Sequence, residues 1–175
     1  MDTTNEQVEK IRGWLSGRLP QDWFEAPVEV TVDREEISVV GALAGPTVAD
    51  GASDAERAAA VSGRIKEFRE RTREHRIEIA RELEHRIGRK VAWGVQVGER
   101  RELFTTLSVP VMTRLRQPER LVLDTLVDAG VARSRSEALA WCVKLVGEHE
   151  SEWIGRLRDA LGAVEEARKG GPASA

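Results

Sequence analysis

The chain has 175 residues, 33% of them charged and 41% hydrophobic, and its formal net charge is -3. This composition excludes an intrinsically disordered chain and allows one or two globular domains. The negative balance excludes a protein that is basic over its whole surface, so a site for nucleic acid has to concentrate its cations locally.

The first part of the chain, residues 1–98, predicts a module of the order α-β-β-α-β. Apolar residues three and four apart indicate a first helix over 4–18. Val28, Val30 and Val32 alternate with polar residues, as expected for a half-buried strand. The other predicted elements are a strand over 37–40, a loop over 41–54, a helix over 55–87 and a strand over 91–97. No motif assigns this module a role, and we expect it to tune oligomerisation or to bind a ligand or a protein partner.

The long helix predicted over 55–87 begins after a capping candidate, Ser53 or Asp54, and ends at Gly88. It is rich in arginine, and glutamates stand three or four residues from several of these arginines. We expect a solvated, ion-paired face, and the alternative is an auxiliary nucleic-acid surface. The arginines concerned are Arg69, Arg71, Arg73, Arg76, Arg81, Arg86 and Arg89.

The second predicted domain covers residues 99–170. A charged bridge, Glu99–Glu102, leads into a strand-rich piece over Leu103–Leu115. An amphipathic helix then begins near Gln117, where Pro118 suits the first turn, and stops at Gly130. A second helix opens on the capping box Ser134–Glu137. A last helix is predicted over 151–168.

The stretch Val109–Gly147 combines a short strand that carries arginines, a helix that ends at a glycine, and a helix that opens on Ser-Arg-Ser-Glu. This order resembles the ribbon-helix-helix DNA-binding proteins, the dimeric family that includes the Arc, MetJ and CopG-like repressors. The resemblance covers about 40 residues. It implies that one strand from each of two subunits pairs antiparallel and that the resulting ribbon enters the major groove of double-stranded DNA.

The resemblance also implies roles for individual residues. In the ribbon, Val111, Thr113 and Leu115 face the helices, and the alternate side chains face the bases. Those base-contacting residues are Met112, Arg114 and Arg116. Arginine suits this task because its planar fork pairs bidentately with guanine. The alternative is an exposed edge strand that its charges protect from aggregation.

By the same resemblance, the start of the second helix clamps the DNA backbone through its free amides and positive dipole end. The residues assigned to this clamp are Arg133, Ser134, Arg135 and Ser136. The alternative is helix capping by Ser134 and Glu137 without DNA. Two residues depart from the family pattern: Pro110 removes a ladder bond near the ribbon, and Thr113 stands at an inward position that is usually apolar.

The sequence gives little support for a metal site, a cofactor site or an active site. His75, Glu78, Glu82 and His85 share one stripe of the long helix, but metal sites of this spacing need carboxylates from facing helices, so we predict no metal. Phosphate-binding glycine loops, nucleophile elbows and paired-cysteine sites are absent from the sequence. We therefore predict no cofactor and no catalytic activity.

The single cysteine, Cys142, excludes an intramolecular disulfide and is typical of a reducing compartment. The sequence shows neither a signal peptide nor an apolar run of about 18 residues. We expect a cytoplasmic, nucleoid-associated protein without a membrane partner.

Together these observations predict an α+β protein that regulates transcription as a homodimer by sequence-specific DNA binding. Two alternatives stay open. One is a dimeric interaction protein that keeps the fold without binding DNA, and the other is an antitoxin-type regulator.

Overall fold

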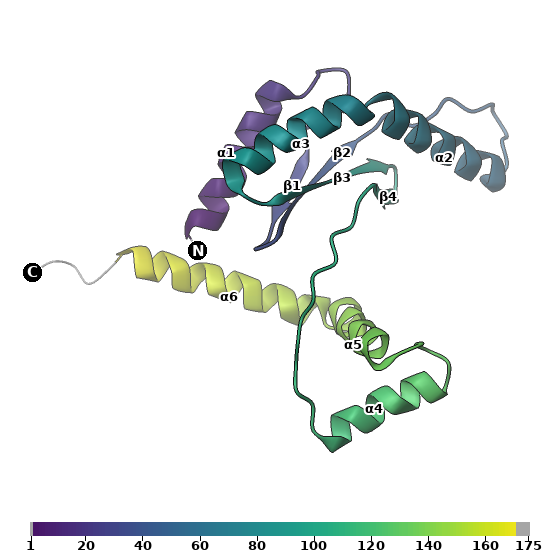
Figure 1. The fold of residues 1–175 in the computed structure, drawn as a ribbon. Helices are drawn as coiled ribbons and strands as arrows, with labels where there is room; N and C mark the ends of the chain where they lie inside the picture. The colour runs from purple at the N-terminus through teal and green to yellow at the C-terminus, as the bar shows by residue number, and fades with distance from the viewer. Residues whose placement is uncertain (1, 171–175) are drawn as a thin grey trace, which may run out of the picture. The chain divides into compact units, whose positions relative to one another are not determined.

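The computed structural model describes residues 2–170 and shows an α+β protein (Figure 1). The chain divides into two compact units, Met1–Val109 and Pro110–Ala175. Each unit is described by itself below.

The first unit combines a four-stranded sheet with three helices (Figure 1). Its elements are α1 (Asp2–Arg18), β1 (Glu29–Val32), β2 (Glu36–Ala42), α2 (Asp54–Arg71), α3 (Arg73–Ile87), β3 (Lys90–Val97) and β4 (Arg100–Leu103). The predicted α-β-β-α-β order is confirmed except that its second helix is divided into α2 and α3, and each strand lies within a few residues of its expected position.

The strands lie in the order β1-β2-β3-β4. β1 and β2 form the predicted antiparallel hairpin, with Val32 opposite Ile37. Its turn is closed by the Asp33 carboxylate, which accepts hydrogen bonds from the amides of Glu35 and Glu36 at 2.8 and 2.7 Å. β2 and β3 are parallel, because α2 and α3 carry the chain back between them.

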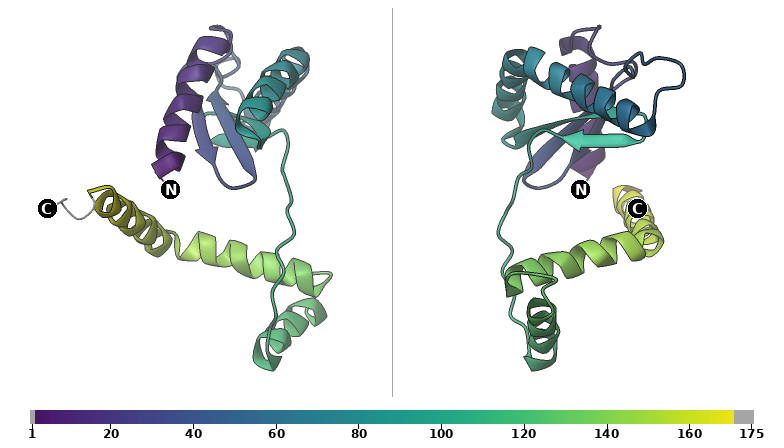
Figure 2. Two further views of the ribbon diagram at one scale, coloured as in Figure 1. Left: turned by 60° about the vertical axis from the view of Figure 1, so that its left-hand side comes forward. Right: turned by 90° about the vertical axis from the view of Figure 1, so that its right-hand side faces the viewer.

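The core of this unit forms where alternate strand residues meet the apolar sides of the helices. α1 runs alongside the β1–β2 side of the sheet (Figure 2). The largest side chains buried below 2% exposure are Phe68, Ile11, Leu15, Ile37, Ile65, Ile79, Leu83, Val39 and Val95. Aromatic rings pack edge-to-face around Trp23, whose centroid lies 5.7 Å from Phe68 and 6.4 Å from Trp93. This core is closed within one chain.

The helix predicted over 55–87 is interrupted at Thr72. The Thr72 hydroxyl donates to the Phe68 carbonyl at 2.7 Å, and the Arg76 guanidinium donates to the Arg69 carbonyl at 2.7 Å. The Phe68 carbonyl also accepts from the Thr72 amide at 3.0 Å, so the hydroxyl is a second donor to it. Side-chain hydrogen bonds of this kind to helix carbonyls bend helices. At the start of α2, Ser53 rather than Asp54 is the N-cap and forms a complete capping box with Glu56.

The end of the sheet differs from the prediction. β4 overlaps the stretch Glu99–Glu102 that was expected to be a charged bridge, and it pairs with β3 through a turn at Gly98, whose φ is 58°. The prediction of a strand-rich piece over Leu103–Leu115 is wrong within one chain, because only Leu103 of this stretch belongs to a strand. An edge strand tolerates charged residues, since one of its sides faces solvent. Here Arg101 pairs with Glu29 at 2.8 Å.

The second unit contains three helices, α4 (Gln117–Asp128), α5 (Arg135–His149) and α6 (Ser151–Gly170). All three were predicted, and α4 carries Pro118 in its first turn as expected. Its buried cluster consists of Leu123, Ala132 and Ala138, with partly buried neighbours around it. The core of this unit is therefore far smaller than that of the first unit.

Candidate nucleic-acid interface

The segment Pro110–Arg116 joins the first unit to α4 without hydrogen bonds of regular secondary structure. Its predicted base-contacting residues are all exposed, and Met112 is 97% exposed. Of the three residues predicted to face inward, Leu115 packs against the buried cluster of the second unit, whereas Val111 is 87% exposed. A strand needs a neighbour for its ladder bonds, and here the described part of the chain supplies none.

The end of this segment is fixed to the first turn of α4. The Arg120 guanidinium donates to the Leu115 carbonyl at 2.8 Å. Arg116 is the N-cap residue of α4, with extended backbone angles. Arg114 and Arg116 therefore lead directly into a rigid helix, which limits where their side chains can reach.

The connection between α4 and α5 is a tight turn. Gly130 has a φ of 73°, the left-handed region that glycine adopts without strain. The Val131 amide donates to the Leu126 carbonyl at 2.9 Å and so completes the end of α4. The turn places the first residues of α5 beside the last turns of α4.

The predicted capping box at the start of α5 forms only in part. The Ser134 hydroxyl accepts from the Glu137 amide at 3.2 Å, as predicted. The Glu137 carboxylate accepts from the Arg133 amide at 2.8 Å and not from the amide of Ser134. No acceptor from the described part of the chain binds the amides of Arg135 and Ser136, so these amides can bind an anion.

The two arginines of the predicted clamp are engaged in ion pairs. Arg133 pairs with Glu137 at 3.1 Å, and Arg135 holds Asp124 of α4 through two hydrogen bonds of 2.6 and 2.8 Å. The Arg135 guanidinium lowers the pKa of Asp124 below its ordinary value. Both side chains of each pair keep solvent contact, so phosphate can compete for the guanidinium groups.

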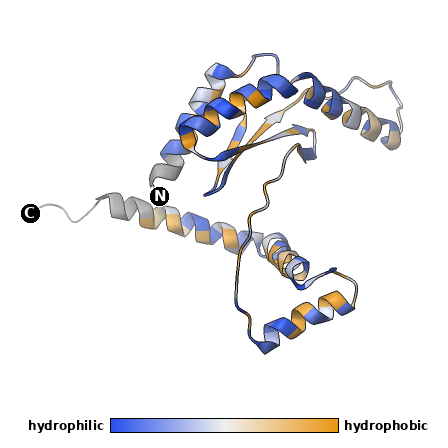
Figure 3. Ribbon diagram, viewed as in Figure 1, coloured by the Kyte–Doolittle hydropathy of each residue, from blue (hydrophilic) through white to orange (hydrophobic). Residues whose placement is uncertain are grey.

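The three helices of the second unit expose many apolar side chains. Hydrophobic residues are coloured orange along α4 and α6 in Figure 3. A hollow of about 370 Å³ lies where α5 meets α6 and includes Cys142 and Ile154. The large apolar side chains exposed in this unit are Val111, Met112, Leu121, Val122, Val131, Trp141, Val143, Val146, Trp153, Leu157, Leu161 and Val164. A monomeric protein rarely exposes so many large apolar residues in one small unit, which indicates an interaction surface.

Sequence analysis missed the acidic partners of the clamp. Glu137 was visible only as a capping residue, although its spacing of four from Arg133 is also that of a helix ion pair. The pairing of Asp124 with Arg135 depends on the turn between α4 and α5, and no local sequence pattern reports it.

The long-helix stripe considered for a metal serves another purpose. Glu82 is bound by Arg18 at 2.7 Å, and His75 lies within 3.3 Å of the same guanidinium. Within residues 2–170, no group of three or more potential ligands has the geometry of a metal site. None of the helices described is long and apolar enough to cross a membrane.

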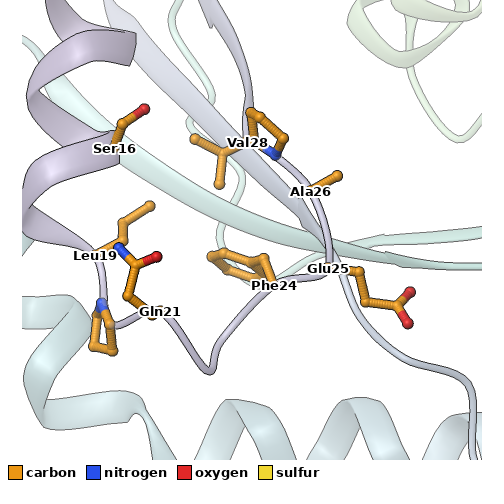
Figure 4. Close-up of a pocket in the computed structure, with 9 residues that line it drawn as sticks. Ser16, Leu19, Gln21, Phe24, Glu25, Ala26 and Val28 are labelled. Carbon is orange, nitrogen blue, oxygen red and sulfur yellow. The ribbon is translucent and has the colours of Figure 1, made fainter.

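A pocket in the first unit lies between the end of α1 and the loop before β1 (Figure 4). Its volume is about 280 Å³, and Leu19, Gln21 and Val28 contribute to its lining. The Phe24 ring lines it as well and packs on β2 at Gly41, where a Cβ atom would lie only 2.2 Å from the ring carbons. Gly41 is thus needed for the close approach of this ring.

Two family models match the chain. The model described as Rv1265-like protein, N-terminal domain, matches residues 9–103, and the model described as Mb1296 C-terminal domain matches residues 116–168. The uncharacterized proteins Mb1296 of Mycobacterium bovis and Rv1265 of Mycobacterium tuberculosis are each 59% identical over 159 residues, which are 91% of this chain and 69% of each relative. Neither family description mentions a ribbon-helix-helix fold. No solved structure matches the chain.

Proposed function

The chain belongs to the Rv1265-like family, and from the geometry of its second unit we propose that it is a homodimeric, sequence-specific DNA-binding regulator of transcription. One observation carries the proposal: the extended segment Pro110–Arg116, which has no strand partner in the described part of the chain, leads directly into a helix pair with only a small core. The proposed role is binding, without a catalytic step.

The dimer is inferred from the small core. A unit of this size whose described residues bury only the cluster of Leu123, Ala132 and Ala138 gains too little from apolar burial to be stable alone. A second copy related by a two-fold axis would cover the exposed apolar residues of α4 and α5. Antiparallel pairing of the two Pro110–Arg116 segments would supply the ladder bonds and bury Val111 between the copies.

The DNA contacts follow from the alternation of side chains along the paired segments. With Val111, Thr113 and Leu115 turned to the helices, Arg114 and Met112 face outward, together with Arg116. One bidentate contact from arginine to guanine contributes about 1–3 kcal/mol of discrimination between bases. Two copies present four such arginines on the outward face of the ribbon.

The backbone contacts follow from the start of α5. The free amides of Arg135 and Ser136 are positioned to donate hydrogen bonds to a phosphate at the positive end of the helix dipole. Arg133 and Ser134 flank the same turn. Because Asp124 and Glu137 neutralise the two arginines in the free protein, we assign the larger part of this contact to the amides.

The test is fluorescence anisotropy with duplexes selected from random sequence by the full-length protein. We expect Arg114→Ala and Arg116→Ala each to lower the affinity for the selected duplex by about tenfold or more, and to lower discrimination between selected and scrambled DNA. Arg158→Ala, which removes an exposed arginine of α6, is the matched control and leaves affinity nearly unchanged. The affinity of the unaltered protein falls steeply with salt.

Equal affinity of the Arg114→Ala/Arg116→Ala double variant and the unaltered protein at several salt concentrations contradicts the proposed reading face. A protein that dimerises but binds no duplex supports the second candidate, a dimeric interaction protein. The observation that favours this second candidate is the pairing of Arg133 and Arg135 with carboxylates, which removes net positive charge from the clamp.

A further inference from the structure

Arg76 of α3 is buried without a carboxylate partner. Arg76 as a whole residue is only 7% exposed, and its guanidinium carbon, Cζ, lies 4.7 Å from the centroid of the Phe104 ring. Nε donates to the Thr72 hydroxyl at 2.9 Å, and Nη2 donates to the Arg69 carbonyl at 2.7 Å. Both acceptors are neutral, and Nη1 has no hydrogen-bond partner among the described residues. Buried charges are normally compensated by an opposite charge, and this one is not.

Two further arginines, Arg69 and Arg73, add to the positive charge around Arg76. Burial first, and then the charges of Arg69 and Arg73, lower the pKa of Arg76 to about 10. Like charges three and four residues apart destabilise a helix. Elsewhere on α2, Arg64 and Arg71 both pair with Glu67. No described carboxylate pairs with Arg69 or Arg73.

A cavity of about 370 Å³ lies beside these residues. Its lining comes from α2, the start of α3 and β4, and consists of Ser62, Lys66, Arg69, Glu70, Arg73 and Glu102. The two acidic residues have cationic partners of their own: Glu102 pairs with Arg100 at 3.2 Å, and Glu70 lies 4.0 Å from Lys66. Arg69 and Arg73 are therefore the uncompensated charges of the lining.

We propose that this cavity, called here the arginine cavity, binds a phosphate group, with Arg69 and Arg73 as its direct ligands. Guanidinium groups match phosphate oxygens through parallel, charge-assisted hydrogen bonds. The bound anion would offset the repulsion among the three arginines, and Arg76 acts as a positioning residue, because it holds the Arg69 carbonyl at the break between α2 and α3. The proposal does not depend on DNA binding by the second unit.

The phosphate group can belong to a small phosphorylated molecule or to a nucleic-acid backbone. The volume of the cavity exceeds that of inorganic phosphate, so both sources are sterically possible. They share the same recognition chemistry, and the experiment separates them.

The experiment is calorimetric titration of the full chain with inorganic phosphate against sodium chloride at matched ionic strength. We expect saturable phosphate binding that Arg69→Gln and Arg73→Gln each weaken by about tenfold. Arg73→Lys keeps the charge without the planar fork and weakens binding less. Arg57→Gln, which removes an exposed arginine near the start of α2, is the matched control and binds like the unaltered protein.

Arg69 and Arg73 are exposed, so both variants should fold, and an unchanged circular dichroism spectrum checks this. Absence of saturable phosphate binding in the unaltered protein overturns the proposal. Binding that is equally strong in Arg69→Gln and Arg73→Gln overturns it as well.

A second arm measures duplex DNA binding by the same variants. Loss of phosphate binding together with loss of DNA affinity assigns the phosphate to a nucleic-acid backbone. Loss of phosphate binding with DNA affinity unchanged assigns it to a small phosphorylated molecule. Both results support the arginine cavity, and neither depends on Arg114 or Arg116, so failure of the proposed ribbon is distinguishable from failure of this site.

Discussion

The two units of this protein differ in how much of their apolar surface they bury. The first unit closes a core around Phe68 and Trp23 with its own helices and sheet. Among the described residues, the second unit buries only Leu123 and two alanines in its core cluster, and it exposes Val143 by 67% and Trp153 by 49%. The first unit thus closes its core as a single chain, whereas the second leaves large apolar side chains uncovered.

This difference indicates which kind of functional site each unit can contain. A closed unit offers sites such as the arginine cavity, in which polar groups retain an uncompensated charge at a cost in stability. An open unit offers its surface, and the extended Pro110–Arg116 segment at its start has the free backbone groups that a second copy can pair with.

The largest loss of stability is expected for a substitution in the closed core of the first unit. Phe68→Ala should lower the free energy of unfolding of the first unit by about 3–5 kcal/mol, because the ring is fully buried and its loss leaves a cavity. Denaturant unfolding measures this value. Arg57→Ala, an exposed change on the same helix, should stay within about 0.5 kcal/mol of the unaltered protein. A loss below about 1 kcal/mol for Phe68→Ala would mean that the core is not closed as described.

A smaller loss of stability is expected where the Phe24 ring packs on the backbone of β2 at Gly41. Gly41→Ala places a Cβ atom 2.2 Å from the Phe24 ring carbons, so the ring has to move, at a cost of about 1–3 kcal/mol. Gly63→Ala is the matched control, because Gly63 lies within α2 with open space around it. There alanine should stabilise by up to about 1 kcal/mol through its higher helix propensity. Thermal unfolding of both variants compares them, and equal shifts would refute the close approach of Phe24.

The helix caps test both units with the same chemical change. Ser53→Ala in the first unit and Ser134→Ala in the second each remove a hydroxyl that accepts from an amide three residues on. Each should cost about 1 kcal/mol. If the second unit dimerises, Ser134→Ala should also weaken the dimer, whereas Ser53→Ala should not. Sedimentation velocity at several concentrations distinguishes the two variants, and identical behaviour would contradict the separate roles of the units.

Acid should weaken the second unit through its ion pairs, the smallest of these effects. Arg135 and Arg133 hold the pKa values of Asp124 and Glu137 below their ordinary values. A carboxyl group with a lowered pKa in the folded state contributes stability above its ordinary pKa and loses it as the pH falls through the lowered value. The midpoint of thermal unfolding of this unit should therefore fall between about pH 5 and pH 3. Arg135→Gln should reduce that pH dependence, and an unchanged dependence would rule out the Asp124 pair as its source.

Much of the fold was predictable because its signals are local. The alternation of Val28, Val30 and Val32 indicated β1, and the glycine and serine around the α4–α5 turn marked both helix ends. The break at Thr72 was not predicted, because the apolar stripe continues through it and no sequence pattern reports that the Arg76 side chain binds the Arg69 carbonyl. β4 was missed because its charged sequence is that of a solvent-exposed edge.

The candidate site was predictable to a smaller degree. Met112, Arg114 and Arg116 were assigned from the ribbon-helix-helix resemblance and the alternation of strand residues, and their exposure does not test that assignment. Pairing between two copies of residues 110–116 is a property of an assembly, and a single chain contains no signal for it other than its uncovered apolar side chains. The carboxylate partners of the clamp depend on tertiary packing and had no local signature.

The central claim is that two copies complete the second unit. Sedimentation equilibrium of the full chain, combined with Thr113→Pro, tests it most directly, because proline at the centre of the segment removes an amide from the proposed ribbon ladder. The account predicts a dimer with twice the chain mass of 19.4 kDa, and a dissociation constant that rises by about tenfold or more in Thr113→Pro. A monomer at all micromolar concentrations, or a dimer that Thr113→Pro leaves unchanged, would contradict it.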